Sequence, residues 1–191
     1  MNERPLRADA QRNRAKVLAA ATAAFALEGI AVPLDEIARQ AGVGAGTVYR
    51  HFPTKEALFE AVMLDRVTRL AEHAKTLATA EEPGAAFFDF LRLMIVGAAS
   101  SKDLVDALLG ADLANAGRIL AAKQQLQEAG GQLLARAQRA GAVRGDLGVS
   151  ELMTLLSGAV MALQQQPGDA HLTDVVFAVL RDGLRGQAVR T

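Results

Sequence analysis

Apolar residues recur every three or four positions along most of this chain, which is the spacing of an amphipathic helix. In the first such stretch, about residues 9–28, Val17, Ala24 and Phe25 fall on one face, and Gly29 follows as a helix terminator. No stretch alternates apolar and polar residues for long enough to predict a strand. The pattern therefore predicts an all-α protein.

Two short helices and a long one are predicted next. Pro33 opens the first short helix, whose apolar positions follow the helical spacing, and Gly42 ends it. A three-residue turn leads to a second short helix over about 45–51. Thr54 is then a candidate N-cap for a long helix that runs to about Thr79.

Further helical segments are predicted beyond Pro83, and breaks containing glycine, serine or proline separate them. They cover about 83–99, 102–109, 111–140, 149–166 and 169–186. The chain is therefore expected to hold about nine helices in three parts: an N-terminal unit at 1–53, a connecting helix at 54–80, and a larger helical domain at 81–191.

The composition is consistent with helices and limits the kinds of metal or cofactor site that the chain could form. The chain of 191 residues is 51% hydrophobic but only 4% aromatic, and it contains no cysteine, which excludes disulfides and thiolate metal sites. Its three histidines, His51, His73 and His171, lie far apart in the sequence. No metal and no cofactor are therefore expected.

The N-terminus is basic, although the whole chain has zero net charge. Five basic residues against two acidic ones give +3 from Met1 to Lys16, which suits contact with phosphates or a solvated tail. The apolar stretch after it resembles a signal peptide, but Glu3 and Asp9 interrupt the leader and alanine dominates. No apolar run approaches the ~20 residues of a membrane span. A cytoplasmic protein without membrane contact is expected.

The stretch "GVGAGTVYRHFPTKEALF", residues 42–59, gathers glycines and hydrogen-bond donors. A dinucleotide-binding loop would need a strand before it and a third glycine where Thr47 stands. Helix, glycine-containing turn and helix is instead the helix-turn-helix arrangement, whose second helix enters the DNA major groove. Arg50 can contact guanine O6 and N7 there. The alternative is that Tyr49 and Arg50 lie on a solvated face.

An enzyme is the alternative from another class. No serine lies in a nucleophile motif with a base nearby, and no paired carboxylates stand out on one helix face. The chain is therefore not expected to be an enzyme, and a small-molecule-binding helical enzyme stays as the remote alternative.

The segment "IARQAGVGAGTVYRHFPTKEALFEAV", Ile37 to Val62, resembles the signature of the TetR/AcrR family of bacterial transcriptional regulators. The match covers roughly residues 10–65. The resemblance implies a homodimer that binds a near-palindromic double-stranded operator through its helix-turn-helix domains. It also implies a variable C-terminal domain that binds a small-molecule effector, and the effector usually lowers operator affinity. A repressor is therefore expected.

The resemblance also assigns roles to residues. The phosphate-contacting positions are Thr47, Tyr49, His51 and Lys55, and Arg50 occupies a base-reading position. Ala45 and Gly46 lie against the bases. Many members have serine at the position of Gly44 and a polar residue at that of Ala45, and often a capping Ser or Thr near Pro33. Direct readout therefore rests heavily on Arg50.

The larger domain offers an effector pocket and a dimer interface only as expectations. An apolar wall of Phe87, Phe90, Leu91 and Met94, with Gln124 and Gln127 as polar groups, would form the pocket. The last two helices would pair across a two-fold axis. Their expected contacts are Leu152, Leu156, Ala159, Leu163, Leu172, Val176 and Val179. The alternatives are plain core packing, and a DNA-binding dimer without an effector.

Overall fold

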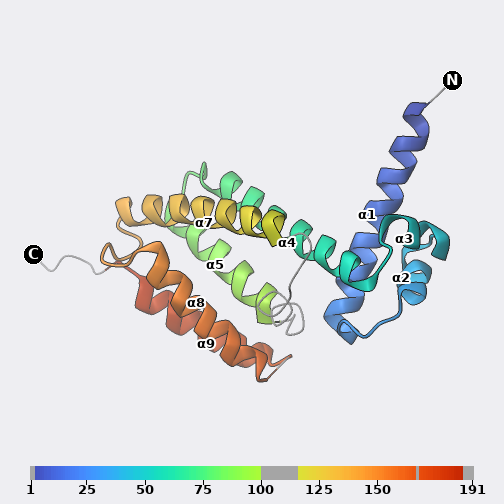
Figure 1. The fold of residues 1–191 in the computed structure, drawn as a ribbon. Coiled ribbons are helices and arrows are strands. Elements are labelled where there is room, and N and C mark those ends of the chain that lie inside the picture. The colour runs from blue at the N-terminus through green and yellow to red at the C-terminus, as the bar shows by residue number, and fades with distance from the viewer. Residues whose placement is uncertain (1–2, 100–115, 167, 187–191) are drawn as a thin grey trace, which may run out of the picture. The chain divides into compact units, whose positions relative to one another are not determined.

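The computed structural model describes residues 3–99, 116–166 and 168–186, and all regular elements in them are α-helices (Figure 1). Eight helices lie in these residues: α1 (Glu3–Glu28), α2 (Leu34–Ala41), α3 (Ala45–His51), α4 (Lys55–Leu77), α5 (Pro83–Ala99), α7 (Ala116–Arg139), α8 (Val149–Gln164) and α9 (Ala170–Leu184). The prediction of an all-α protein is confirmed.

Most predicted helices agree with the structure to within a few residues. α1 is the exception, because it begins at Glu3 and not near Asp9. Apart from Pro5, which lies in the first turn where proline is tolerated, the residues before Asp9 are good helix formers, so the helix can extend beyond its amphipathic part. The helix predicted at 102–109 lies outside the described residues.

α1, α2, α3 and the start of α4 form a small N-terminal unit around a common core. Ile37 from α2 and Val48 from α3 are fully buried. Phe25 of α1 packs against Phe59 of α4, with ring centroids 5.8 Å apart. Each helix therefore contributes its apolar stripe to one core, which holds α3 in place against α1 and α2.

The turn between α2 and α3 depends on one glycine. Gly42 has φ 65° and ψ 34°, the left-handed conformation that ends α2, and its N–H donates to the carbonyls of Ala38 and Arg39. Gly44, by contrast, has φ −67°, which any residue can adopt. Only Gly42 is therefore required by the backbone of this turn.

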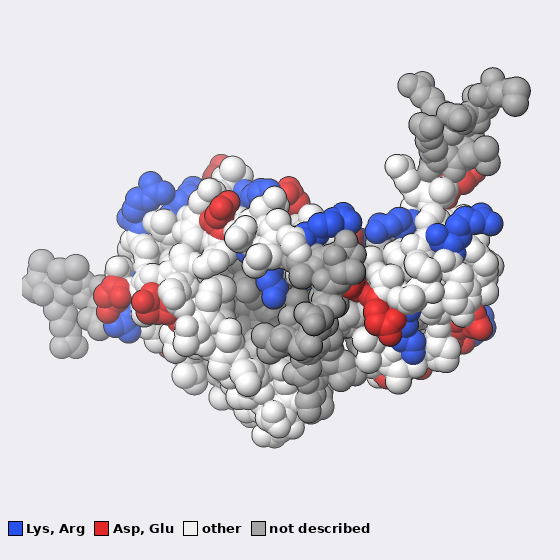
Figure 2. Space-filling model, in the orientation of Figure 1, with Lys and Arg blue, Asp and Glu red and all other residues white. Residues whose placement is uncertain are grey.

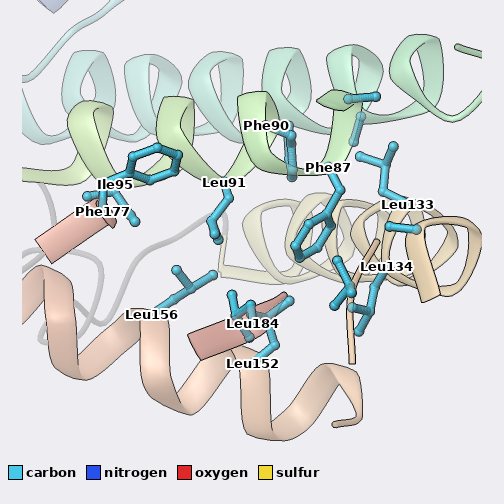
Figure 3. Packing of buried hydrophobic residues seen from close by; sticks show 14 of the residues in the cluster. Phe87, Phe90, Leu91, Ile95, Leu133, Leu134, Leu152, Leu156, Phe177 and Leu184 are labelled. Carbon is cyan, nitrogen blue, oxygen red and sulfur yellow. The ribbon is translucent and has the colours of Figure 1, made fainter. Parts of the chain in front are cut away.

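The larger unit packs α5 against α7, α8 and α9 (Figure 3). Phe87 and Leu91 of α5 point toward α7 and α8, and Phe177 of α9 closes the cluster near Ile95. The largely apolar sequence of α5 is consistent with this central position.

Two long polar side chains fix the loops of this unit. Arg136 of α7 donates to the carbonyls of Ala78 and Ala80, which lie in the loop after α4. Gln138 donates to the carbonyls of Arg144 and Leu147 in the loop before α8, at 2.9 and 2.8 Å. These bonds satisfy loop carbonyls that no helix pairs.

The chain divides into two compact units, and the boundary between them falls inside α4, between Asp65 and Arg66. It thus lies within the connecting helix predicted at 54–80. Among the described helices, none is both long and apolar enough to cross a membrane.

Candidate functional site

The outer face of α3 is the candidate nucleic-acid surface. Val48 is fully buried and faces the core, so the opposite side of the helix belongs to Gly46 and Arg50, each about 200° of rotation away. Arg50 is exposed, and Tyr49 beside it is 47% exposed. Thr47 and His51 are half-buried on the other flank. All the residues predicted to contact DNA from α3 therefore lie on or beside one exposed face.

The basic residues around α3 differ in whether their side chains already contact other groups of the protein. The guanidinium of Arg14 lies 5.4 Å from the centroid of the Phe52 ring, a cation–π contact that ties α1 to the end of α3. Arg39 donates to Glu36 at 2.6 and 2.8 Å, and its hydrogen bond is the main reason that the pKa of Glu36 falls to about 2. No hydrogen bond or ion pair joins Arg50 to another described residue. Arg50 is thus the basic side chain on this face that is available to a ligand.

Lys55 has a contact that the sequence did not indicate. Its Nζ donates to the backbone carbonyl of Ala31, in the loop between α1 and α2, at 2.9 Å. The side chain is half-buried at the first turn of α4. An ammonium has three N–H donors, so two of them remain for a phosphate.

Thr54 fixes the start of α4, as predicted for an N-cap. Its hydroxyl oxygen accepts from the N–H of Ala57 at 3.1 Å. Glu56 in the same turn has a lowered pKa, because its own backbone N–H and the Thr54 side chain donate to its carboxylate. By contrast, Pro33 and Gly44 begin α2 and α3 without any side-chain cap, in keeping with the two departures noted in the sequence.

The side chains predicted for an effector pocket divide into two groups. Phe87, Phe90, Leu91 and Met94 do lie together, around a cavity of about 10 Å³ between α5, α7 and α8. That volume holds at most about one water molecule. The other lining residues are Gly130, Val149, Leu152, Met153 and Leu156, so no lining side chain is charged. Gln124 and Gln127 lie exposed on α7 and do not line the cavity.

The residues predicted for a dimer interface differ in their exposure. Leu152, Leu156 and Leu163 are buried inside the subunit, and Ala159, Leu172 and Val176 are half-buried. Val179 is 67% exposed. Three other large apolar side chains are exposed on the same two helices, namely Leu155, Met161 and Val175. Figure 2 shows that the visible surface over most of α8 carries no charged side chain.

Arg66 makes a half-buried polar contact that the sequence analysis did not predict. It lies at the middle of α4 and donates to the backbone carbonyl of Gly97 in α5, and burial lowers its pKa. A Cβ at position 97 would lie 3.1 Å from its Nη2. The signal was present in the sequence, because Arg66 follows Val62 and Met63 at helical spacing and so falls on the core-facing side of α4.

A metal centre finds no support in the described part of the chain. No group of three or more histidine, cysteine, aspartate or glutamate side chains there could hold an ion. Figure 2 shows both basic and acidic side chains over the N-terminal unit. The exposed chemistry is thus that of a helix-turn-helix surface, with Tyr49 and Arg50 at its centre.

Two family models match the chain on either side of α4. The model described as "Bacterial regulatory proteins, tetR family" matches residues 17–62. The model described as "Transcriptional regulator SbtR-like, C-terminal domain" matches residues 82–186, which is more than half of the chain. The chain therefore belongs to the TetR family of bacterial transcriptional regulators, which are DNA-binding regulatory proteins and not enzymes.

Solved structures agree with this assignment over nearly the whole chain. A TetR transcription regulatory protein from Mycobacterium vanbaalenii is 50% identical with a TM-score of 0.76, covering 95% of this chain and 99% of that one. The TetR regulator SCO0520 from Streptomyces coelicolor is 33% identical with a TM-score of 0.75, covering 92% and 99%.

A curated relative matches only in the DNA-binding part. The HTH-type transcriptional regulator SrpR of Pseudomonas putida is 40% identical over 60 residues, which is 31% of this chain and 28% of that protein. The chain thus matches less than a third of the length of this relative.

Proposed function

We propose that this protein is a dimeric repressor in the bacterial cytosol that binds a near-palindromic operator and is released by a small, largely apolar effector. The observation that carries the DNA-binding part is the exposed outer face of α3, where Arg50 has no described partner. Thr47, Tyr49, His51 and Lys55 surround it as phosphate donors. One such unit covers only a few base pairs, so two are needed for useful specificity.

The test is selection of binding sequences from random double-stranded DNA by the purified full-length protein. An inverted repeat should emerge, with half-site centres about 34–36 Å apart or a multiple of that distance. Anisotropy titrations of the selected DNA should show affinity falling steeply with salt. Equal affinity for selected and scrambled DNA would refute an operator-binding regulator.

The proposed dimer face is the outward side of α8 and α9. Val175 and Val179 lie one turn apart on α9, opposite the buried Phe177 and Leu184. Leu155 and Met161 add exposed apolar area on α8, and Gly158 and Ala162 leave room for a close partner helix. Exposed apolar faces on adjacent helices are typical of an interface between subunits. Leu152, Leu156 and Leu163 would then support this face from the subunit core.

The effector is proposed to bind at the cavity lined by Phe87, Phe90, Leu91 and Met94. Support comes from its wholly apolar lining and from Met94 and Met153, whose unbranched side chains can rearrange to admit a ligand. A charged effector would lose its hydration there without gaining a partner. Gln124 and Gln127 would reach an effector in this cavity only if α7 rotated about its own axis.

A second candidate is a DNA-binding dimer whose larger domain only dimerises. The small size of the cavity, about 10 Å³, favours it. A thermal-shift screen with small apolar compounds separates the two candidates. A sensor should be stabilised by some of them, and by about 2.7 kcal/mol at a hundredfold excess over Kd. A dimer-only domain should respond to none.

A further inference from the structure

The exposed face of α3 has few side chains that can form hydrogen bonds, although it is proposed to enter a DNA groove. Its two residues opposite the core are Gly46 and Arg50. On one flank lie Ala45 and Tyr49, and on the other lie Thr47 and His51, both half-buried. Tyr49 and Arg50 are therefore the two residues of α3 that are both exposed and able to donate a hydrogen bond (Figure 1 marks α3).

The fold does not require glycine at positions 44 and 46, at the start of this helix. A Cβ added at Gly44 or at Gly46 would meet no atom within 4 Å, and neither residue has a positive φ. A glycine inside a helix costs about 1 kcal/mol relative to alanine. The glycine at position 46 therefore weakens the helix without relieving any contact within the subunit, and it leaves the volume beside Arg50 open.

Arg50 is the one side chain placed to use that volume. Side chains of a helix lean toward its N-terminus, so Arg50 extends over the turn that contains Gly46. Its guanidinium is planar and presents a fork of donors that matches guanine O6 and N7. Tyr49 presents a single hydroxyl, which a phosphate oxygen satisfies as readily as a base.

We propose that each α3 reads one G·C base pair directly, through Arg50, and that the rest of the half-site is selected by the shape and deformability of the DNA. This inference rests on the proposed function. Since the side chains of Ala45 and Gly46 carry no donor or acceptor, they cannot distinguish base edges, and base pairs beside them are sensed mainly through close contact with the helix backbone. Sequence then affects affinity there through groove width and bending.

The experiment repeats the selection from random DNA with the full-length wild-type protein and with Arg50→Gln. For the wild type, one guanine per half-site should stand out, and its replacement should weaken binding about 5- to 150-fold. Replacing any other base pair under α3 should weaken binding less than replacing this guanine does. Arg50→Gln should replace the guanine by adenine at that position, because a glutamine amide pairs with adenine N6 and N7.

Two further variants test whether the readout is confined to Arg50. Tyr49→Phe removes the neighbouring hydroxyl and should leave base preference unchanged. Ala45→Gln should add a preference at a second base pair, since position 45 is exposed and its present side chain offers no donor.

Three results would overturn the proposal. They are two or more strongly selected base pairs under each α3, an unchanged preference in Arg50→Gln, and an altered preference in Tyr49→Phe. If the wild type selects no sequence at all, the proposed operator binding fails along with it. If an inverted repeat is selected but the guanine is missing, only the role of Arg50 fails.

Discussion

Lys55 shows at the scale of one residue how a side chain can both hold the fold and contact a ligand. Its Nζ is bonded to the carbonyl of Ala31 before any DNA is present. The bond ties the first turn of α4 to the loop that precedes α2. A phosphate contact by the remaining N–H groups would thus start from a side chain that is already positioned, which lowers the entropy lost on binding.

Lys55→Met should therefore have two separable effects. Loss of the bond to Ala31 should destabilise the protein by about 0.5–1.5 kcal/mol, measured by urea unfolding. Loss of the charge should reduce the slope of log affinity against log salt by about 0.9 per subunit. Lys75→Met, which removes an exposed lysine paired with Glu72 on the same helix, is the matched control and should change neither. If Lys55→Met had the same urea midpoint of unfolding as the wild type, the contact with the Ala31 carbonyl would have no role in stability.

At the scale of elements, the helix-turn-helix requires glycine at position 42 but not at position 46. Gly42 ends α2 with φ 65°, and a Cβ there would meet no atom within 4 Å. The cost of a larger residue is thus backbone strain and not a clash. Gly46 lies inside α3 with ordinary helical geometry, and here a larger residue should help the helix.

Gly42→Ala and Gly46→Ala should consequently shift stability in opposite directions. The first should destabilise by about 1–2 kcal/mol through the left-handed backbone. The second should stabilise by up to about 1 kcal/mol through helix propensity. Urea unfolding of both variants measures the difference, and the same sign for both would contradict the distinction drawn between them.

The outward side of α9 gives a second test at this scale. Val179→Asp places a charge at a side chain that is 67% exposed in the subunit, so the subunit should still fold. In a dimer the carboxylate would be buried without a partner, and the dimer should dissociate. Light scattering measures this, with Gln132→Asp at an exposed position of α7 as the control. Val176→Asp is a less clean test, because Val176 also packs against the subunit core.

At the scale of the whole molecule, the bond from Arg66 to Gly97 is a polar contact through which α5 can act on α4. Met94, which lines the cavity, lies about one turn before Gly97 on α5. A ligand that displaces α5 would move the carbonyl that Arg66 holds. The start of α4 packs within the DNA-binding unit through Leu58 and Phe59, so a shift of α4 would be felt in that unit of the same subunit.

Coupling of this kind must be reciprocal. If a compound found by the thermal-shift screen weakens operator binding a hundredfold, about 2.8 kcal/mol, saturating operator must weaken that compound by the same factor. Calorimetry with and without operator measures this. Arg66→Met should keep the affinity for the compound and reduce the coupling. Equal affinities for the compound with and without operator would exclude allosteric release.

The sequence by itself determined most of the described helices and the residues that are exposed on α3. Helical spacing and glycine or proline breaks are local properties, so α2, α3, α4 and α5 could be placed closely from sequence. The face of α3 followed in the same way, since the burial of Val48 sets which residues point outward.

The tertiary structure decided which of these side chains have partners. The bond of Lys55 to Ala31 and that of Arg66 to Gly97 join residues 24 and 31 positions apart, and no local pattern encodes such a distance. Similarly, the apolar stripes of α8 and α9 are wide enough to serve both a core and an interface. Packing of α5 against one side buries Leu152 and Leu156 and leaves Val175 and Val179 exposed, because only the fold sets which side of each stripe meets a neighbour.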